Sequence, residues 1–214
     1  MKRIYLLIIT LLISFSCTNR EKNYFWFLDK DIDYKRVESV FIEYISFFPK
    51  KGDAENLNTT WSLNPDVEYN LKVLFSYDNL SFKEKKAWLE NLSVAKYEAS
   101  NDSLFVLNRF SSDKNYGYPN KNEVKRGLIS QKYFDDLLPI PNFSNFSSIY
   151  TNTTVCKLPE DFIIYVLNAK SGVFLEEEQL TKGKYMPKNW IHGYSKGVAV
   201  SSHRNEMIYW VIIW

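Results

Sequence analysis

The strongest run of apolar positions lies near the end of the sequence. Residues 207–214, MIYWVIIW, are apolar without a break, so side chains on both sides of a strand would be apolar. A strand of this kind normally lies inside a sheet, because neither of its faces can be left in water. We therefore expect 206–214 to be an interior strand, paired with 197–201 on one side and with 162–168 on the other.

Two turn signals support an antiparallel arrangement of these strands. His203–Asn205 separates the run GVAVSS from the run EMIYWVIIW, and Ser171-Gly172 ends the run that starts at Phe162. Short apolar runs bounded by polar and Gly-containing clusters are typical of hairpins. A further hairpin is predicted around Ser100–Asp102, between VAKYEA and SLFVLNRF.

The first half of the sequence contains the helical patterns. In SFKEKKAWLENL, Ser81 and Glu84 have the spacing of a capping box, and apolar positions such as Phe82 and Leu89 lie on one face. A second helical stripe follows Pro65. Residues 37–48 match a helical face, but their β-branched and aromatic residues suit a strand equally, so both interpretations stay open.

Together these patterns predict an α+β fold. We expect an antiparallel sheet with C-terminal strands 162–168, 197–201 and 206–214, and helices segregated in the N-terminal half.

The first seventeen residues have a different organisation. Lys2 and Arg3 precede an apolar run over 4–13, which is too short to span a bilayer because a spanning helix needs about 20 apolar residues. A basic start, a short apolar run and a small residue are the parts of an export signal. Ser16-Cys17 after this run resembles the lipobox of bacterial lipoproteins, although Ser14 stands where Leu is usual.

The resemblance implies a lipid anchor. In that family the thiol, here that of Cys17, receives a diacylglycerol, the signal is removed before it and the new amino terminus is acylated. We therefore expect a signal peptide at 1–16, a lipidated Cys and tether at 17–30, and one globular domain at 31–214. The expected location is the bacterial cell envelope, with the outer membrane favoured where the cell has one. The alternative is an ordinary signal peptide with an incidental Cys.

The charge and the cysteine content limit which partners and which covalent bonds we expect. Without residues 1–16 the chain has 25 basic residues (27 − 2) and 25 acidic ones, which gives no electrostatic footprint for nucleic acid. If Cys17 is lipidated, Cys156 has no partner for a disulfide, and we expect it to be a small buried apolar residue.

The sharpest chemical motif is GYSKG at 193–197, which fits the nucleophile elbow of serine hydrolases and makes Ser195 a candidate nucleophile. A nucleophile elbow needs a helix after the serine, whereas VAVSS follows here and favours a strand. The glycines therefore indicate a tight structural loop. His192 and His203 are the only histidines, so we expect no metal site. The sequence also contains no cofactor fingerprint.

Three aromatic residues, Trp190, Tyr194 and Tyr185, are candidates for a ligand-binding, sugar-stacking platform. The expected function is that of a non-enzymatic, lipid-anchored envelope protein that presents a surface to a protein partner, as an accessory, inhibitor or immunity-type factor. Two alternatives remain open: a carbohydrate-binding accessory lipoprotein, and a serine hydrolase that uses Ser195.

Overall fold

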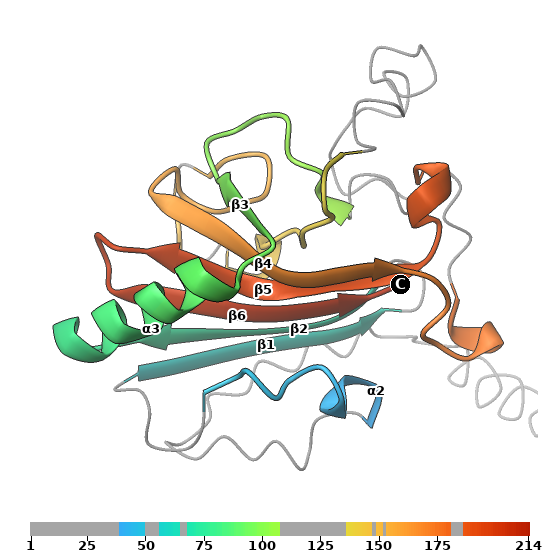
Figure 1. Cartoon of the computed structure of the whole chain (residues 1–214), viewed down its shortest axis with the longest axis horizontal. Helices are drawn as coiled ribbons and strands as arrows, with labels where there is room; N and C mark the ends of the chain where they lie inside the picture. Colours follow the sequence, from blue (N-terminus) through green and yellow to red (C-terminus); the bar gives the residue numbers. More distant parts are fainter. Residues whose placement is uncertain are drawn as a thin grey trace, which may run out of the picture.

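The structure is a computed structural model that describes residues 39–49, 56–64, 68–107, 136–146, 149–151, 153–180 and 186–214. Within these residues the chain forms one six-stranded sheet in the order β1-β2-β6-β5-β4-β3 (Figure 1). Every neighbouring pair of strands is antiparallel. The strands are β1 (Asn56–Asn64), β2 (Glu68–Ser76), β3 (Ala95–Glu98), β4 (Phe162–Ser171), β5 (Gly193–Ser201) and β6 (Glu206–Ile213).

The expected interior position of the last strand is confirmed, but one of its predicted neighbours is wrong. β6 pairs with β5 on one side and with β2 on the other, whereas 162–168 lies within β4 on the far side of β5. The segment after Pro65 was predicted as a helix, and it forms β2 instead. Leu71, Val73 and Phe75 alternate along this strand and pack on one face of the sheet, so tertiary packing overrides the helical spacing.

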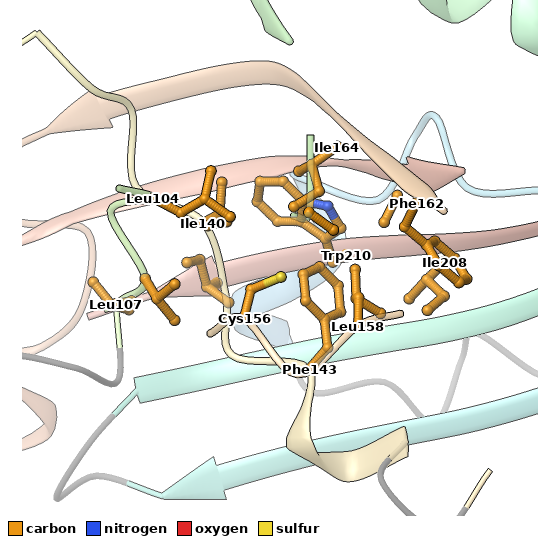
Figure 2. Close-up of a cluster of buried hydrophobic side chains, with 14 of the residues drawn as sticks. Leu104, Leu107, Ile140, Phe143, Cys156, Leu158, Phe162, Ile164, Ile208 and Trp210 are labelled. Carbon is orange, nitrogen blue, oxygen red and sulfur yellow. The ribbon is translucent and has the colours of Figure 1, made fainter. Parts of the chain in front are cut away.

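The sheet buries both of its faces. Along β6, Ile208, Trp210 and Ile212 contribute to one core cluster, while Tyr209 and Val211 contribute to the other. Figure 2 shows the first cluster, in which side chains from loops, among them Phe143, Cys156 and Leu158, pack against the strands. This side is called the loop-covered face below. Cys156 is fully buried there, as expected.

The opposite side, called the helix-covered face, carries the two α-helices of the described residues, α2 (Ser39–Ile42) and α3 (Asn79–Leu92). Phe82 and Leu89 of α3 and Phe41 and Phe48 of the segment 39–49 pack on it. The helices precede most strands in sequence and lie on one side of the sheet, so the α+β class is confirmed. Residues 39–48 of the ambiguous segment form a short helix followed by turns.

The start of α3 differs from the prediction. The helix begins at Asn79, and its N-cap is Asp78, whose side chain accepts hydrogen bonds from the backbone N–H groups of Leu80 and Ser81. The Ser81 hydroxyl also donates to Asp78 at 2.6 Å, so it does not act as the cap of a capping box. A carboxylate cap accepts hydrogen bonds from the free N–H groups, and its negative charge interacts favourably with the positive end of the helix dipole.

The hairpin predicted around Ser100–Asp102 is also wrong. β3 pairs with β4, and residues 104–107 leave the sheet to join the loops of the loop-covered face, where Val106 forms an isolated bridge with Ile140. The apolar residues of this run fill the core of the loop-covered face. They do not form a strand that pairs with β3.

Three short 3₁₀ helices complete the described elements, namely η4 (Ser144–Phe146), η5 (Glu177–Gln179) and η6 (Lys188–Trp190). None of the described helices has the length and apolar character needed to cross a bilayer.

Candidate functional site

Ser195, the candidate nucleophile, lies inside β5 and belongs to the loop-covered side of the sheet. Its side chain is fully buried, and its hydroxyl donates to the carbonyl oxygen of Pro139 at 2.6 Å. The residues after it continue the strand, so the strand-to-helix turn of a nucleophile elbow is not formed here. In this setting Ser195 fixes the 139–140 loop to the sheet.

The aromatic candidates are placed on different faces. Trp190 is buried in the cluster of the loop-covered face, where its ring lies 6.0 Å from that of Trp214 and its carbonyl accepts a hydrogen bond from the Trp214 indole. Tyr194 packs on the helix-covered face and is half-buried. The structure therefore does not bring these two residues into one platform. Tyr185 and Cys17 lie outside the described residues.

Tyr194 is the centre of an aromatic group at one end of the helix-covered face. Its ring centroid lies 4.8 Å from that of Tyr44 and 4.8 Å from that of Phe174, which meets it edge-on. The Tyr194 hydroxyl donates to the side-chain oxygen of Asn168 at 3.0 Å. Three segments that are distant in sequence, 39–49, β4 with the residues after it, and β5, thus converge on one tyrosine.

The pairing register adds two lysines to this group. Asn168 of β4 lies opposite Lys196 of β5, and Lys170 lies opposite Tyr194. Directly opposed residues project from the same face of a sheet, so all four belong to the helix-covered face. The register shift between Val166 and Asn168 makes this possible, because the extra residue changes which side chains of β4 face the helix-covered side.

Lys196 is the less exposed of the two lysines. Its ammonium nitrogen lies 5.5 Å from the centre of the Phe47 ring, and burial lowers its pKa from the ordinary value. Burial also raises the pKa of Tyr44, with smaller contributions from Glu43 and Tyr194. Within the described part of the chain, neither Lys196 nor Lys170 forms an ion pair with a carboxylate.

Exposed aliphatic side chains stand close in sequence to the members of the aromatic group. Ile42 is 57% exposed, Val173 63% and Ile191 44%. Each stands within three residues of Tyr44, Phe174 or Tyr194, and a backbone hydrogen bond from Gly172 to His192 joins the segments that carry Val173 and Ile191. We call the region formed by Tyr44, Phe174, Tyr194, Asn168, Lys170 and Lys196, with these three aliphatic residues at its border, the Tyr194 surface.

A second group of polar residues lies at the β5–β6 turn. Asp161 accepts a hydrogen bond from the Ser201 hydroxyl and pairs with Arg204, and the hydroxyl of Tyr150 donates to Glu206 at 2.9 Å. Burial and the neighbouring Glu206 raise the pKa of Tyr150 well above its ordinary value. These groups satisfy one another, and they attach the turn to the 150–161 loop.

Exposed apolar residues also occur at the end of α3. Trp88 and Leu92 stand one helical turn apart, and Val94 follows the helix. Unlike the Tyr194 surface, this group is drawn from one continuous segment. Charged residues of both signs, Glu84 and Lys85, stand one helical turn before Trp88, so charge does not favour one kind of partner there.

No protein family, curated protein or solved structure matched the chain when it was compared with them. In the described ranges, no group of three or more His, Cys, Asp or Glu residues has a geometry that could hold a metal ion.

Proposed function

We propose that the protein is a non-enzymatic, lipid-anchored protein of the bacterial cell envelope, and that the Tyr194 surface is where it binds a protein partner. The supporting observation is the convergence of half-buried aromatic side chains from three segments at one place, with exposed aliphatic residues next to them in sequence. Tyrosine supplies a large contact area at a low cost in conformational entropy, and it is enriched at the energetic centres of protein interfaces.

The anchor part of the proposal rests on the lipobox-like sequence at Ser16-Cys17. Cys17→Ala in the full-length protein should abolish acylation and move the protein from the membrane fraction to the soluble fraction. A variant that stays with the membranes after a high-salt wash would refute the lipid anchor. Two or more acyl chains are needed for this distinction, because a single chain binds a bilayer only marginally.

The interface part is tested by site-specific photocrosslinking in the producing cells. A photoreactive amino acid in place of Val173 should give a discrete crosslinked species that contains another protein. The same replacement at Val94 is the matched control, because both valines are 63% exposed but only Val173 borders the Tyr194 surface. No crosslink at Val173, or equal crosslinking at both sites, would contradict the proposal.

The carbohydrate-binding alternative has one observation in its favour, which is the hydrogen-bonded pair of Tyr194 and Asn168 beside an exposed border. It predicts that the purified protein binds members of a glycan array, and that Tyr194→Ala removes this binding.

A further inference from the structure

The Tyr194 surface combines positive charge with aromatic rings, and this combination constrains what it can bind. Lys170 and Lys196 project from the helix-covered face of adjacent strands, and Tyr194 stands opposite the first and two residues before the second. In an antiparallel pair, directly opposed residues have Cβ atoms about 4.5–5.5 Å apart and diagonal ones about 7–8 Å. One ligand of modest size can therefore contact both lysines and the tyrosine.

The two lysines differ in their surroundings. Lys170 is exposed and hydrated, whereas Lys196 is half-buried, with its ammonium group near the face of the Phe47 ring. A partly buried charge is costly unless it is paired, and a ring face compensates for only part of the lost water. A carboxylate placed beside Lys196 would replace the favourable interactions with water that the ammonium group loses on burial.

The acidic residues of the surrounding segments do not supply that carboxylate. Glu43 stands next to Tyr44, and Glu176 follows two residues after Phe174, but in the described structure neither forms an ion pair with Lys196 or Lys170. The remaining polar group, Asn168, accepts the hydroxyl proton of Tyr194 through its oxygen, which leaves its amide N–H groups available as donors. Among the described residues, the two lysines and the Asn168 amide therefore outnumber the one carboxylate, that of Glu43, that acts on Tyr44.

We infer that the Tyr194 surface recognises an acidic segment of its partner protein, in which an Asp or Glu carboxylate lies beside Lys196 and an adjacent apolar side chain contacts Tyr44 and Tyr194. This inference rests on the proposed function and adds the chemistry of the partner. The carboxylate fixes the orientation of the segment, and the exposed aliphatic border supplies the apolar contact. Such a division between a polar determinant and an apolar contact is common in protein interfaces.

The test uses the full-length protein with the photoreactive residue at position 173. Lys196→Gln should lower the yield of the crosslinked partner about tenfold, which corresponds to the loss of one good charged contact. Lys196→Arg keeps the charge and should retain most of the yield. Lys96→Gln is the matched control, because the Lys96 ammonium also lies 5.5 Å from a ring, that of Tyr165, but on the edge strand β3, two strands away from β5.

Two further measurements identify the partner's chemistry. A zero-length carbodiimide, which joins an amine to a carboxylate, should link Lys196 or Lys170 to an Asp or Glu of the same partner, as read by mass spectrometry. The crosslink at 173 should also weaken with added salt, because the Debye length shortens from about 10 Å at 0.1 M to about 3 Å at 1 M.

The outcomes separate the inference from the proposed function. A partner that crosslinks at 173 equally well in wild type and Lys196→Gln, whatever the salt, would leave the protein interface in place and overturn the acidic segment. No partner at 173 would overturn both. Binding of the purified protein to immobilised polygalacturonate, lost in Lys196→Gln and kept in Lys96→Gln, would assign the surface to an acidic glycan and overturn the protein assignment.

Discussion

The residues of GYSKG at 193–197 alternate between the two faces of the sheet, and each has a separate structural role. Ser195 points to the loop-covered face and is buried, while Tyr194 and Lys196 on either side of it belong to the helix-covered face. Gly197 is needed for close packing, because a Cβ there would collide with the carbonyl oxygen of Tyr165 and the ring of Trp210. The match to a hydrolase motif therefore arises from the needs of a packed strand.

The buried hydrogen bond of Ser195 leads to the first prediction. Ser195→Ala should lower the free energy of unfolding by about 1–3 kcal/mol, because the Pro139 carbonyl loses its donor in a buried place. Denaturant unfolding measures this change. Partner crosslinking at position 173 should be unaffected in the folded variant.

Ser202→Ala is the control for this substitution, since Ser202 is exposed and such changes usually stay within about 0.5 kcal/mol. Covalent labelling of Ser195 by a fluorophosphonate would contradict its structural role and support the hydrolase alternative.

At the scale of the element, α3 shows which local signals could be recognised in the sequence. The helix itself and its buried positions Phe82 and Leu89 were predictable from their spacing. Its start was not, because Asp78 and Ser81 are both good caps and the sequence does not show which side chain reaches the free N–H groups. β2 was misassigned for a related reason, since its apolar positions fit both a helical stripe and an alternating strand.

The cap of α3 leads to a prediction about pH. Hydrogen bonds from Ser81 and Leu80 lower the pKa of Asp78, and the Ser81 side chain makes the largest contribution. A carboxyl group whose pKa is lower in the folded state stabilises the fold above its unfolded pKa, and this stabilisation is lost as the pH falls through the folded pKa. Asp78→Ala should therefore destabilise the protein near neutral pH, and the difference from wild type should shrink in acid.

Thermal unfolding of both proteins between pH 7 and strongly acidic conditions measures this difference. Asp78→Asn is the matched control, because Asn also caps helices but carries no charge. It should retain more of the stability than Asp78→Ala and remove the pH dependence that Asp78 contributes. Equal loss in the two variants at all pH values would show that the cap does not act through its carboxylate.

At the scale of the whole molecule, the position of β6 follows from its composition, whereas its neighbours do not. All residues from Met207 to Trp214 are at most 2% exposed, which agrees with a run that is apolar on both sides. The pairing of β6 with β2 depends on contacts between distant segments. The Tyr194 surface was unpredictable for the same reason, because Tyr44, Phe174 and Lys196 meet only after the sheet has formed.

Removal of residues 207–214 should therefore prevent folding. Burial of one large apolar side chain contributes about 1.5–3 kcal/mol, so eight buried residues together exceed the net stability of about 5–15 kcal/mol that is typical of a domain. The shortened protein, expressed without residues 1–16, should be insoluble or lack a cooperative thermal transition.

A milder pair of substitutions keeps this test quantitative. Ile212→Ala should cost about 2–5 kcal/mol because Ile212 is fully buried in the central strand. Ile191→Ala, at an exposed isoleucine, should change stability by no more than about 0.5 kcal/mol. Similar values for the two variants would show that β6 lies outside the cooperative core.

The pairing of β2 with β6 also sets the time at which a newly made chain can fold. Tyr77 and Tyr209, whose hydroxyls hydrogen bond to each other, are 132 residues apart. During translation β2 lacks its second neighbour until β6 has left the ribosome, and pairings between such distant segments form slowly. The nascent chain thus carries an unfinished sheet through most of its synthesis. We therefore expect its exposed apolar surface to be bound by chaperones until the central strand arrives.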